Sequence, residues 1–175
     1  MYEIGDLIMY GVTGVCKVTD ISRPDFDGLD NDSLYYILQP LYQNGVIYAP
    51  VENNKIYSRP VISEEEANEL IDKMPAITTE IFRSSSIQQL SKHYQEVLDT
   101  HSTIELIRMT KSIHKKKLDA QKQNRHLGQI DKKFMKRAED LLYGELAAAL
   151  EIPIEEVGDY IEDRIGPELA AAENS

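Results

Sequence analysis

The sequence contains a single cysteine, no tryptophan and no long apolar run, and these absences limit the class of protein that it can encode. The one cysteine, Cys16, excludes a disulfide within the chain. Because Cys16 lies beside Val15 and Val18 in a strand-like stretch, we expect a small buried thiol without a redox role. The longest purely apolar run, residues 146–150, is far shorter than a membrane span. We therefore expect no membrane-spanning segment and no membrane partner.

The start of the chain has no basic segment followed by an apolar stretch, so it does not resemble a secretory signal. We therefore expect a cytoplasmic protein, and a monomeric one. Hydrophobic residues make up 42% of the chain and charged residues 28%, which is typical of soluble globular proteins. A length of 175 residues accommodates one domain of ordinary size or two small domains.

Charge is distributed unevenly along the chain. The net charge of −11 argues against indiscriminate binding to nucleic acid. Residues 111–137 nevertheless contain ten cationic side chains and two carboxylates, so this segment carries +8 and the rest of the chain carries −19. The ten cations are Lys111, Lys115, Lys116, Lys117, Lys122, Arg125, Lys132, Lys133, Lys136 and Arg137. The segment is either an ordinary solvated helical surface or a site for an anionic partner.

Residues 1–62 have the pattern of a small β module. β-branched and aromatic residues are dense, turn-forming residues recur between them, and no helical period is present. The pattern predicts five short strands, at residues 6–10, 15–21, 34–41, 46–51 and 55–59. The connections are short, which favours antiparallel pairing, so we expect a small β-barrel.

The pattern becomes helical at Ser63. Ser63 and Glu66 form a capping box that starts a helix, and Pro75 ends it. A second capping box, Ser102 with Glu105, precedes apolar residues that recur at spacings of three and four. Another helix is predicted before it, over residues 86–99.

The clearest helical pattern covers residues 131–150, where several apolar residues share one face. Lys132, Lys133, Lys136 and Arg137 crowd the first turns of this helix. Cations near a helix N-terminus oppose the helix dipole. Such a cluster asks for an explanation, and an anionic partner is one.

The last predicted helix begins at Pro153 and ends near residue 161. Residues 166–175 have little to bury, so we expect them to fray. The sequence thus predicts an α+β fold, in which a β module at residues 1–62 precedes a bundle of about five helices at residues 63–165.

Three stretches of the sequence resemble the CarD family, whose N-terminal module also occurs in the bacterial transcription-repair coupling factor. The first is IGDLIMYGVTGV at residues 4–15, which is similar to the family's opening strand and turn. The second comprises YYILQPL at 35–41, IYAPVEN at 47–53 and RPVIS at 59–63, and it resembles the family's central hairpin and exit. The third is KRAEDLLYGELA at 136–147, which resembles the family's most recognisable helical signature.

The resemblance spans residues 3–162 and implies that the N-terminal module is a Tudor-like (SH3-like) antiparallel β-barrel. In the family this module binds the β subunit of bacterial RNA polymerase by adding one sheet edge to another. Edge pairing is physically reasonable, because unpaired main-chain groups supply affinity and alternate side chains supply specificity. The resemblance assigns this contact to Arg23, Ile47, Tyr48 and Ala49.

The resemblance also implies that the helical domain contacts promoter DNA near the upstream edge of the transcription bubble and so modulates initiation. Family members carry a tryptophan wedge there, whereas this chain has none; Arg83 falls closest to that position and Phe82 is adjacent. Phe82 is a substitute wedge or a core phenylalanine. With the basic segment, the predicted DNA-contacting residues are Phe82, Arg83, Lys111, Lys115, Lys116, Lys122, Arg125, Lys132, Lys133, Lys136 and Arg137.

Two other classes of function remain open. The acidic remainder and the missing tryptophan also fit a protein-only or RNA-binding adaptor, which would use the β module for a protein partner without contacting DNA. An enzyme is disfavoured, because the sequence has no nucleophile motif and no phosphate-binding glycine loop. The sequence therefore predicts a non-enzymatic transcription regulator without a cofactor.

A metal site is not expected. The acidic residues at 25–32 invite a calcium interpretation, but in a standard calcium loop Leu29 would occupy a ligand position. The four histidines show no spacing typical of metal ligands. An acidic surface turn is the favoured interpretation of residues 25–32.

Overall fold

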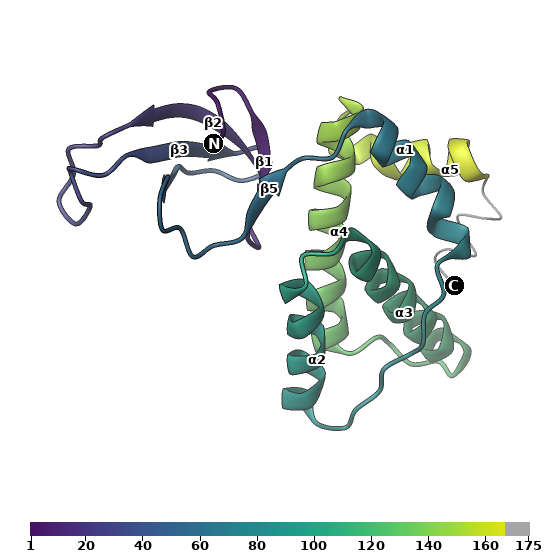
Figure 1. The fold of residues 1–175 in the computed structure, drawn as a ribbon. Helices are drawn as coiled ribbons and strands as arrows, with labels where there is room; N and C mark the ends of the chain where they lie inside the picture. Colours follow the sequence, from purple (N-terminus) through teal and green to yellow (C-terminus); the bar gives the residue numbers. More distant parts are fainter. Residues whose placement is uncertain (167–175) are drawn as a thin grey trace. The chain divides into compact units, whose positions relative to one another are not determined.

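The computed structural model describes residues 1–166, which form two compact units (Figure 1). The first unit is Met1–Ile62, and the second begins at Ser63, the residue that caps the first helix. The tail that the sequence predicts to fray lies outside the described residues, except for Gly166.

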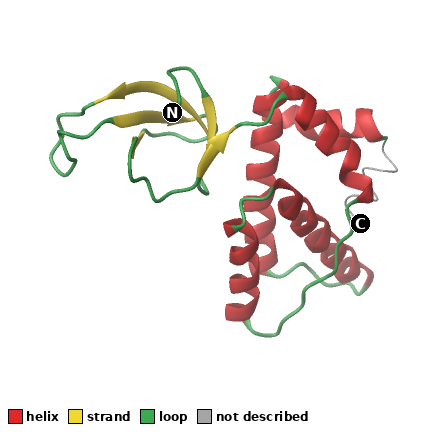
Figure 2. Ribbon diagram, in the orientation of Figure 1, coloured by secondary structure: helices red, strands yellow, loops and turns green. Residues whose placement is uncertain are grey.

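The first unit is a five-stranded antiparallel sheet, drawn in yellow in Figure 2. Its strands are β1 (Leu7–Tyr10), β2 (Gly14–Ser22), β3 (Tyr35–Pro40), β4 (Ile47–Pro50) and β5 (Ser58–Pro60). They are arranged in the order β4-β3-β2-β1-β5, so β4 and β5 form the two edges.

One face of the sheet carries the core of this unit. Side chains alternate between the two faces of a strand, and alternate apolar residues of four strands meet on this face. They are Ile8, Tyr10, Cys16, Val18, Tyr36, Leu38 and Ala49. The β2–β3 pairing shifts register between Val18 and Asp20, which is a bulge that bends the sheet.

Strand β5 begins three residues later than the predicted strand 55–59. Asn53 adopts a left-handed conformation with φ of 58°, and the Asn54 side chain accepts a hydrogen bond from the Ile56 amide at 3.0 Å. Such local side-chain bonds favour a turn over a strand, and they hold this segment out of the sheet.

The second unit contains five α-helices and two short 3₁₀ segments. They are α1 (Glu64–Lys73), η1 (Met74–Ala76), α2 (Ile87–Asp99), α3 (Thr103–Lys122), α4 (Gln129–Leu150), η2 (Ile154–Glu156) and α5 (Val157–Ile165). The predicted capping box is present: the Ser63 hydroxyl accepts from the Glu66 amide at 3.1 Å, and the Glu66 carboxylate accepts from the Ser63 amide at 3.2 Å. Ser86 and Ser102 cap α2 and α3 with their hydroxyls, which accept from the Gln89 and Glu105 amides. Only the serine half of the second predicted capping box is formed, because the Ser102 amide donates to the Thr100 hydroxyl at 3.3 Å and not to Glu105.

The observed elements confirm the predicted α+β class, with an antiparallel sheet before five helices. The last helix extends to Ile165, four residues beyond its predicted end, because Val157, Ile161 and Ile165 are all buried on one face. No helix in the described part of the chain is both long and apolar enough to cross a membrane.

Candidate functional site

Strand β4 presents an open main-chain edge in the first unit. The Val51 amide donates to the Leu34 carbonyl at 3.0 Å, and β4 continues the same antiparallel register, with Tyr36 opposite Ala49 and Ile37 opposite Tyr48. Hydrogen-bonded and non-hydrogen-bonded pairs alternate in such a ladder. The Tyr48 amide and carbonyl therefore point away from β3, toward the free edge.

The side chains of β4 divide between the two faces of the sheet. Tyr48 lies on the face opposite the core, half-buried, with its ring 5.2 Å from that of Phe26 in an edge-on arrangement. Phe26 belongs to the acidic turn that follows β2 and is 51% exposed. The two rings form an aromatic patch beside the open edge. The sequence motifs did not identify Phe26. Its position as an aromatic residue within an acidic turn is the feature of the sequence that could have indicated it.

The other residues assigned to this contact have different positions. Ala49 is buried in the core with 1% of its surface exposed, so its side chain is not available to a partner. Ile47 is half-buried and packs against the same core. Arg23 is exposed just after β2, at the end of the sheet where Ser22, Tyr35 and Pro50 pair in succession.

The Cys16 thiol lies inside the core of the β unit with none of its surface exposed, as the sequence predicts. Burial raises the pKa of the thiol to about 11. Only the thiolate reacts readily with disulfide reagents, so Cys16 should be unreactive in the folded protein at pH 8. Labelling with a chromogenic disulfide should give one thiol per chain in denaturant and none without it. Rapid labelling of the native protein would contradict this assignment.

Lys111 was predicted to contact DNA, but the structure buries it. It is 5% exposed, and its ammonium group donates to the Met74 carbonyl at 3.1 Å and to the Ile77 carbonyl at 2.6 Å. These carbonyls lie at and just after η1, so Lys111 ties this turn to α3. Lys111 is therefore removed from the predicted DNA-contacting set.

Lys116 is a second correction, because it also points into the helical core. Its ammonium group lies 2.8 Å from the Asp131 carboxylate, and these side chains are 9% and 7% exposed. Tyr94 donates its hydroxyl proton to the same carboxylate oxygen at 2.5 Å. This buried triad joins α2, α3 and α4. The Lys116 charge is paired inside the bundle, so it is not available to DNA.

Phe82 and Arg83 lie in the segment between η1 and α2. The Phe82 ring is half-buried and stacks on His93, with 3.8 Å between ring centroids. Burial lowers the pKa of His93 below its usual value, which favours a neutral imidazole in this stack. Arg83 forms an exposed ion pair with Asp119 of α3 at 2.8 Å. The structure thus holds both predicted side chains against neighbouring helices.

The cations at the start of α4 form two rows on its exposed side. Lys132 and Lys136 make one row, and Lys136 pairs with Asp140 at 2.9 Å. Lys133 and Arg137 make the other, each with its charged group 5.7 Å from the centre of the Phe134 ring. All four are exposed, whereas Phe134 and Ala138 on the opposite side are buried. The structure therefore brings the four predicted α4 cations together on one surface.

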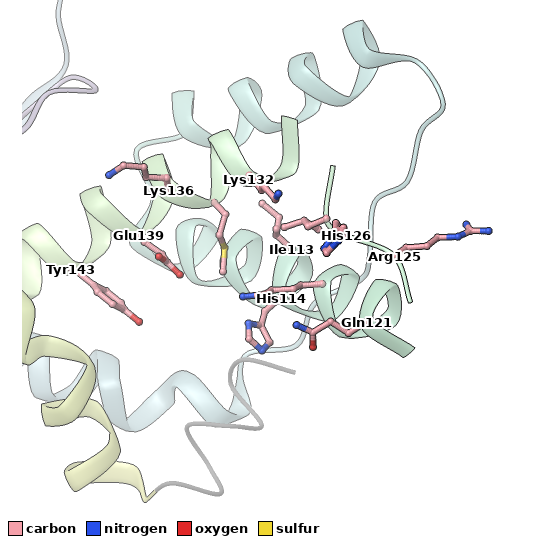
Figure 3. A pocket seen from close by; sticks show the side chains of 12 residues that line it. Ile113, His114, Gln121, Arg125, His126, Lys132, Lys136, Glu139 and Tyr143 are labelled. Carbon is pink, nitrogen blue, oxygen red and sulfur yellow. The ribbon is translucent and has the colours of Figure 1, made fainter. Parts of the chain in front are cut away.

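The cations of α3 do not all share that surface. Lys115 and Lys117 are about 200° apart around the helix axis at 100° per residue. Lys117 lines a cleft between α3 and α4, whereas Lys115 and Lys122, seven residues apart, lie on another side of α3. Arg125, in the connection between the two helices, lies at the rim of the cleft and extends outward (Figure 3). The basic segment is thus divided between two sides of the bundle.

The cleft between α3 and α4 has a volume of about 460 Å³ (Figure 3). Its walls combine four cations with apolar and polar side chains. They are Ile113, His114, Lys117, Gln121, Arg125, His126, Leu127, Lys132, Met135, Lys136, Glu139 and Tyr143. Within residues 1–166, no group of three or more His, Cys, Asp or Glu side chains is arranged to hold a metal ion.

The fold and its open edge define an α+β protein whose antiparallel sheet offers main-chain groups to a partner. Residues 2–62 match the family of the CarD-like/TRCF RID domain, a match that covers the first compact unit. Residues 2–62 therefore form an RNA polymerase-interacting domain of the CarD-like type, as the sequence motifs of this part of the chain predict. A comparison with curated proteins found no match to the chain.

Proposed function

We propose that this chain is a bacterial regulator of transcription initiation that binds the β subunit of RNA polymerase with β4 and promoter DNA with the exposed cations of α4. The observation that carries the proposal is the open β4 edge, which lies within a domain of an RNA polymerase-interacting family. Pairing at that edge would add a strand of the β subunit beside Tyr48.

The proposed DNA contact is supported by the surface at the start of α4. Lys132 and Lys133, the fourth and fifth residues of α4, oppose the helix dipole. Of the four cations, Lys132, Lys133 and Arg137 have no carboxylate partner among residues 1–166. Phosphates of DNA would supply the missing negative charge near the upstream edge of the opened promoter. Lys122 and Arg125 are exposed and Lys115 is half-buried, and these three residues extend the set of available cations.

A salt titration of DNA affinity tests this contact. Each neutralised phosphate contributes about 0.9 to the slope of log affinity against log salt for duplex DNA. A variant with Lys132, Lys133, Lys136 and Arg137 all changed to Glu should therefore flatten that slope by about 3.6. Affinity for promoter DNA, and the gain in polymerase binding that DNA provides, should both fall.

The matched control changes Lys17, Lys55, Lys73 and Lys92 to Glu, which alters the net charge equally at exposed positions of other elements. Its salt slope should stay close to that of the wild type. An equal loss in the control would assign the effect to net charge alone. If the wild type binds polymerase but shows no salt-dependent affinity for DNA, the protein is better described as a protein-only adaptor. This result would contradict the proposed DNA contact.

A further inference from the structure

The cleft between α3 and α4 has the composition of a ligand site as well as of a basic surface. Its volume of about 460 Å³ is in the range of small-molecule pockets, about 300 to 1,000 Å³. Apolar side chains of both helices and of the connection line it, namely Ile113, Leu127 and Met135, and the Tyr143 ring lies at one end. Duplex phosphates would leave these apolar groups without a partner.

Cations around the apolar side chains make the cleft attractive to an anion. Among residues 1–166, Lys117, Arg125 and Lys132 form no ion pair, and the Lys136 pair with Asp140 is exposed to solvent. His114 is half-buried in the wall, and burial together with the nearby Lys117 charge lowers its pKa below the usual value. The cleft therefore favours a ligand with a negatively charged end.

Glu139 limits what that ligand can be. Among residues 1–166, it is the only carboxylate that lines the cleft, and it extends from α4 between Lys136 and Tyr143 (Figure 3). Burial raises its pKa above the usual value, and the Asp140 charge raises it further, although Lys117 and Lys136 oppose this shift. A carboxylate here would repel a bare anion. It suits a ligand that also carries hydrogen-bond donors.

We propose that the cleft binds a single nucleotide, with its phosphate between Lys117 and Lys132 and its base against the apolar wall. Tyr143 offers the base a stacking surface, and Glu139 accepts a hydrogen bond from the base edge. A nucleotide combines the three required properties: an anionic end, a flat apolar ring and ring-edge donors. The inference goes beyond the proposed function, because the duplex and polymerase contacts require no occupied cleft.

Two probes that differ at one position of the base test the role of Glu139. CMP offers the exocyclic amino group of cytosine, whereas UMP has a carbonyl oxygen at the same position, which a carboxylate repels. Isothermal titration should give CMP an affinity about fivefold or more above that of UMP, the low end for a good base contact. Glu139→Gln should remove this preference, because an amide can donate to the uracil carbonyl or accept from the cytosine amine.

Neighbouring residues of α4 provide the matched pair of charge variants. Lys132 lines the cleft, and Lys133 lies beside Phe134, outside it. Lys132→Glu should lower CMP affinity at least tenfold, and Lys133→Glu should leave it within about twofold. Duplex DNA affinity should fall equally in both, so a failure of the DNA proposal is distinguishable from a failure of this one. Thermal melting verifies that both variants are folded.

The source of the nucleotide is decided by comparing CMP with a short deoxycytidine oligonucleotide in competition. Tighter binding of the oligonucleotide identifies an unpaired strand, and tighter binding of CMP identifies a free nucleotide; both outcomes support the site. The proposal is overturned if CMP does not bind, if inorganic phosphate binds as tightly as CMP, or if Lys133→Glu weakens CMP as much as Lys132→Glu.

Discussion

Replacing Asp131 with Ala should remove about 3 to 5 kcal/mol of unfolding free energy, because the buried Lys116 ammonium would lose its counter-charge. The same change leaves the Tyr94 hydroxyl without its acceptor. The pKa of Tyr94 is raised above its usual value, chiefly by burial and then by the hydrogen bond and negative charge of Asp131. The phenol therefore remains a neutral donor. Three helices thus lose one shared contact.

Thermal or urea unfolding monitored by circular dichroism measures this loss. For a unit of this size, 1 kcal/mol corresponds to about 4 to 8 °C in Tm, so the melting temperature of the helical unit should fall by at least about 12 °C. The exposed pair Lys136–Asp140 is the matched control, since its N–O distance of 2.9 Å is almost the same as in the buried pair. Asp140→Ala should cost less than about 1 kcal/mol.

A double variant separates the loss of the pair from the burial of an unpaired charge. Lys116→Met combined with Asp131→Leu replaces the ions by apolar groups, so it should recover most of the stability that Asp131→Ala loses. If Asp131→Ala melts with the wild type, the triad does not hold the three helices together and the assignment of Lys116 to the core is wrong.

The second large effect is expected at the edge of the sheet. Tyr48→Arg should weaken binding to purified bacterial RNA polymerase by about 30-fold or more, the factor typical of an aromatic hot spot of about 2 kcal/mol. The substitution removes the ring that packs on Phe26 and places a long charged side chain beside the open main-chain groups of β4. Biolayer interferometry with immobilised polymerase measures the dissociation constant.

Tyr57→Arg is the matched control for this variant. Tyr57 is also an exposed tyrosine of the β unit, at 46%, but it precedes β5 at the other edge of the sheet. It should bind polymerase within about threefold of the wild type. If both variants lose affinity equally, or if Tyr48→Arg binds like the wild type, the contact does not lie at β4.

A backbone variant separates the edge from the side chain. Tyr48→Pro removes an amide that points away from β3, so the β3–β4 ladder should persist while an added strand loses a hydrogen-bond donor. Tyr48→Phe keeps both the ring and the amide and should bind like the wild type.

Local features of the sequence determined most of the secondary structure. Ser63, Ser86 and Ser102 begin helices because a serine hydroxyl satisfies amides within three residues of itself. Alternating apolar residues likewise predicted four strands to within about a residue or two. The turn at Asn53 and Asn54 escaped prediction because its β-branched and aromatic neighbours have the composition of a strand.

The candidate contacts depended more on tertiary structure. Sequence motifs identified the β4 residues, but only the strand order makes β4 an edge, and only the register aims the Tyr48 main chain outward while Ala49 enters the core. Which side of a strand faces solvent is set by the neighbouring strands, and these are distant in sequence.

What the sequence by itself determined about this protein is the α+β class, the serine caps of three helices, the domain family of residues 2–62 and the excess of positive charge over residues 111–137. Tertiary structure alone decided which of those charges are available. Lys111 is held by carbonyls 34 and 37 residues away and Lys116 by a carboxylate 15 residues away, so both are buried. The sequence does not distinguish a surface lysine from a buried one, because only the groups that fold around the side chain determine whether its charge is already paired.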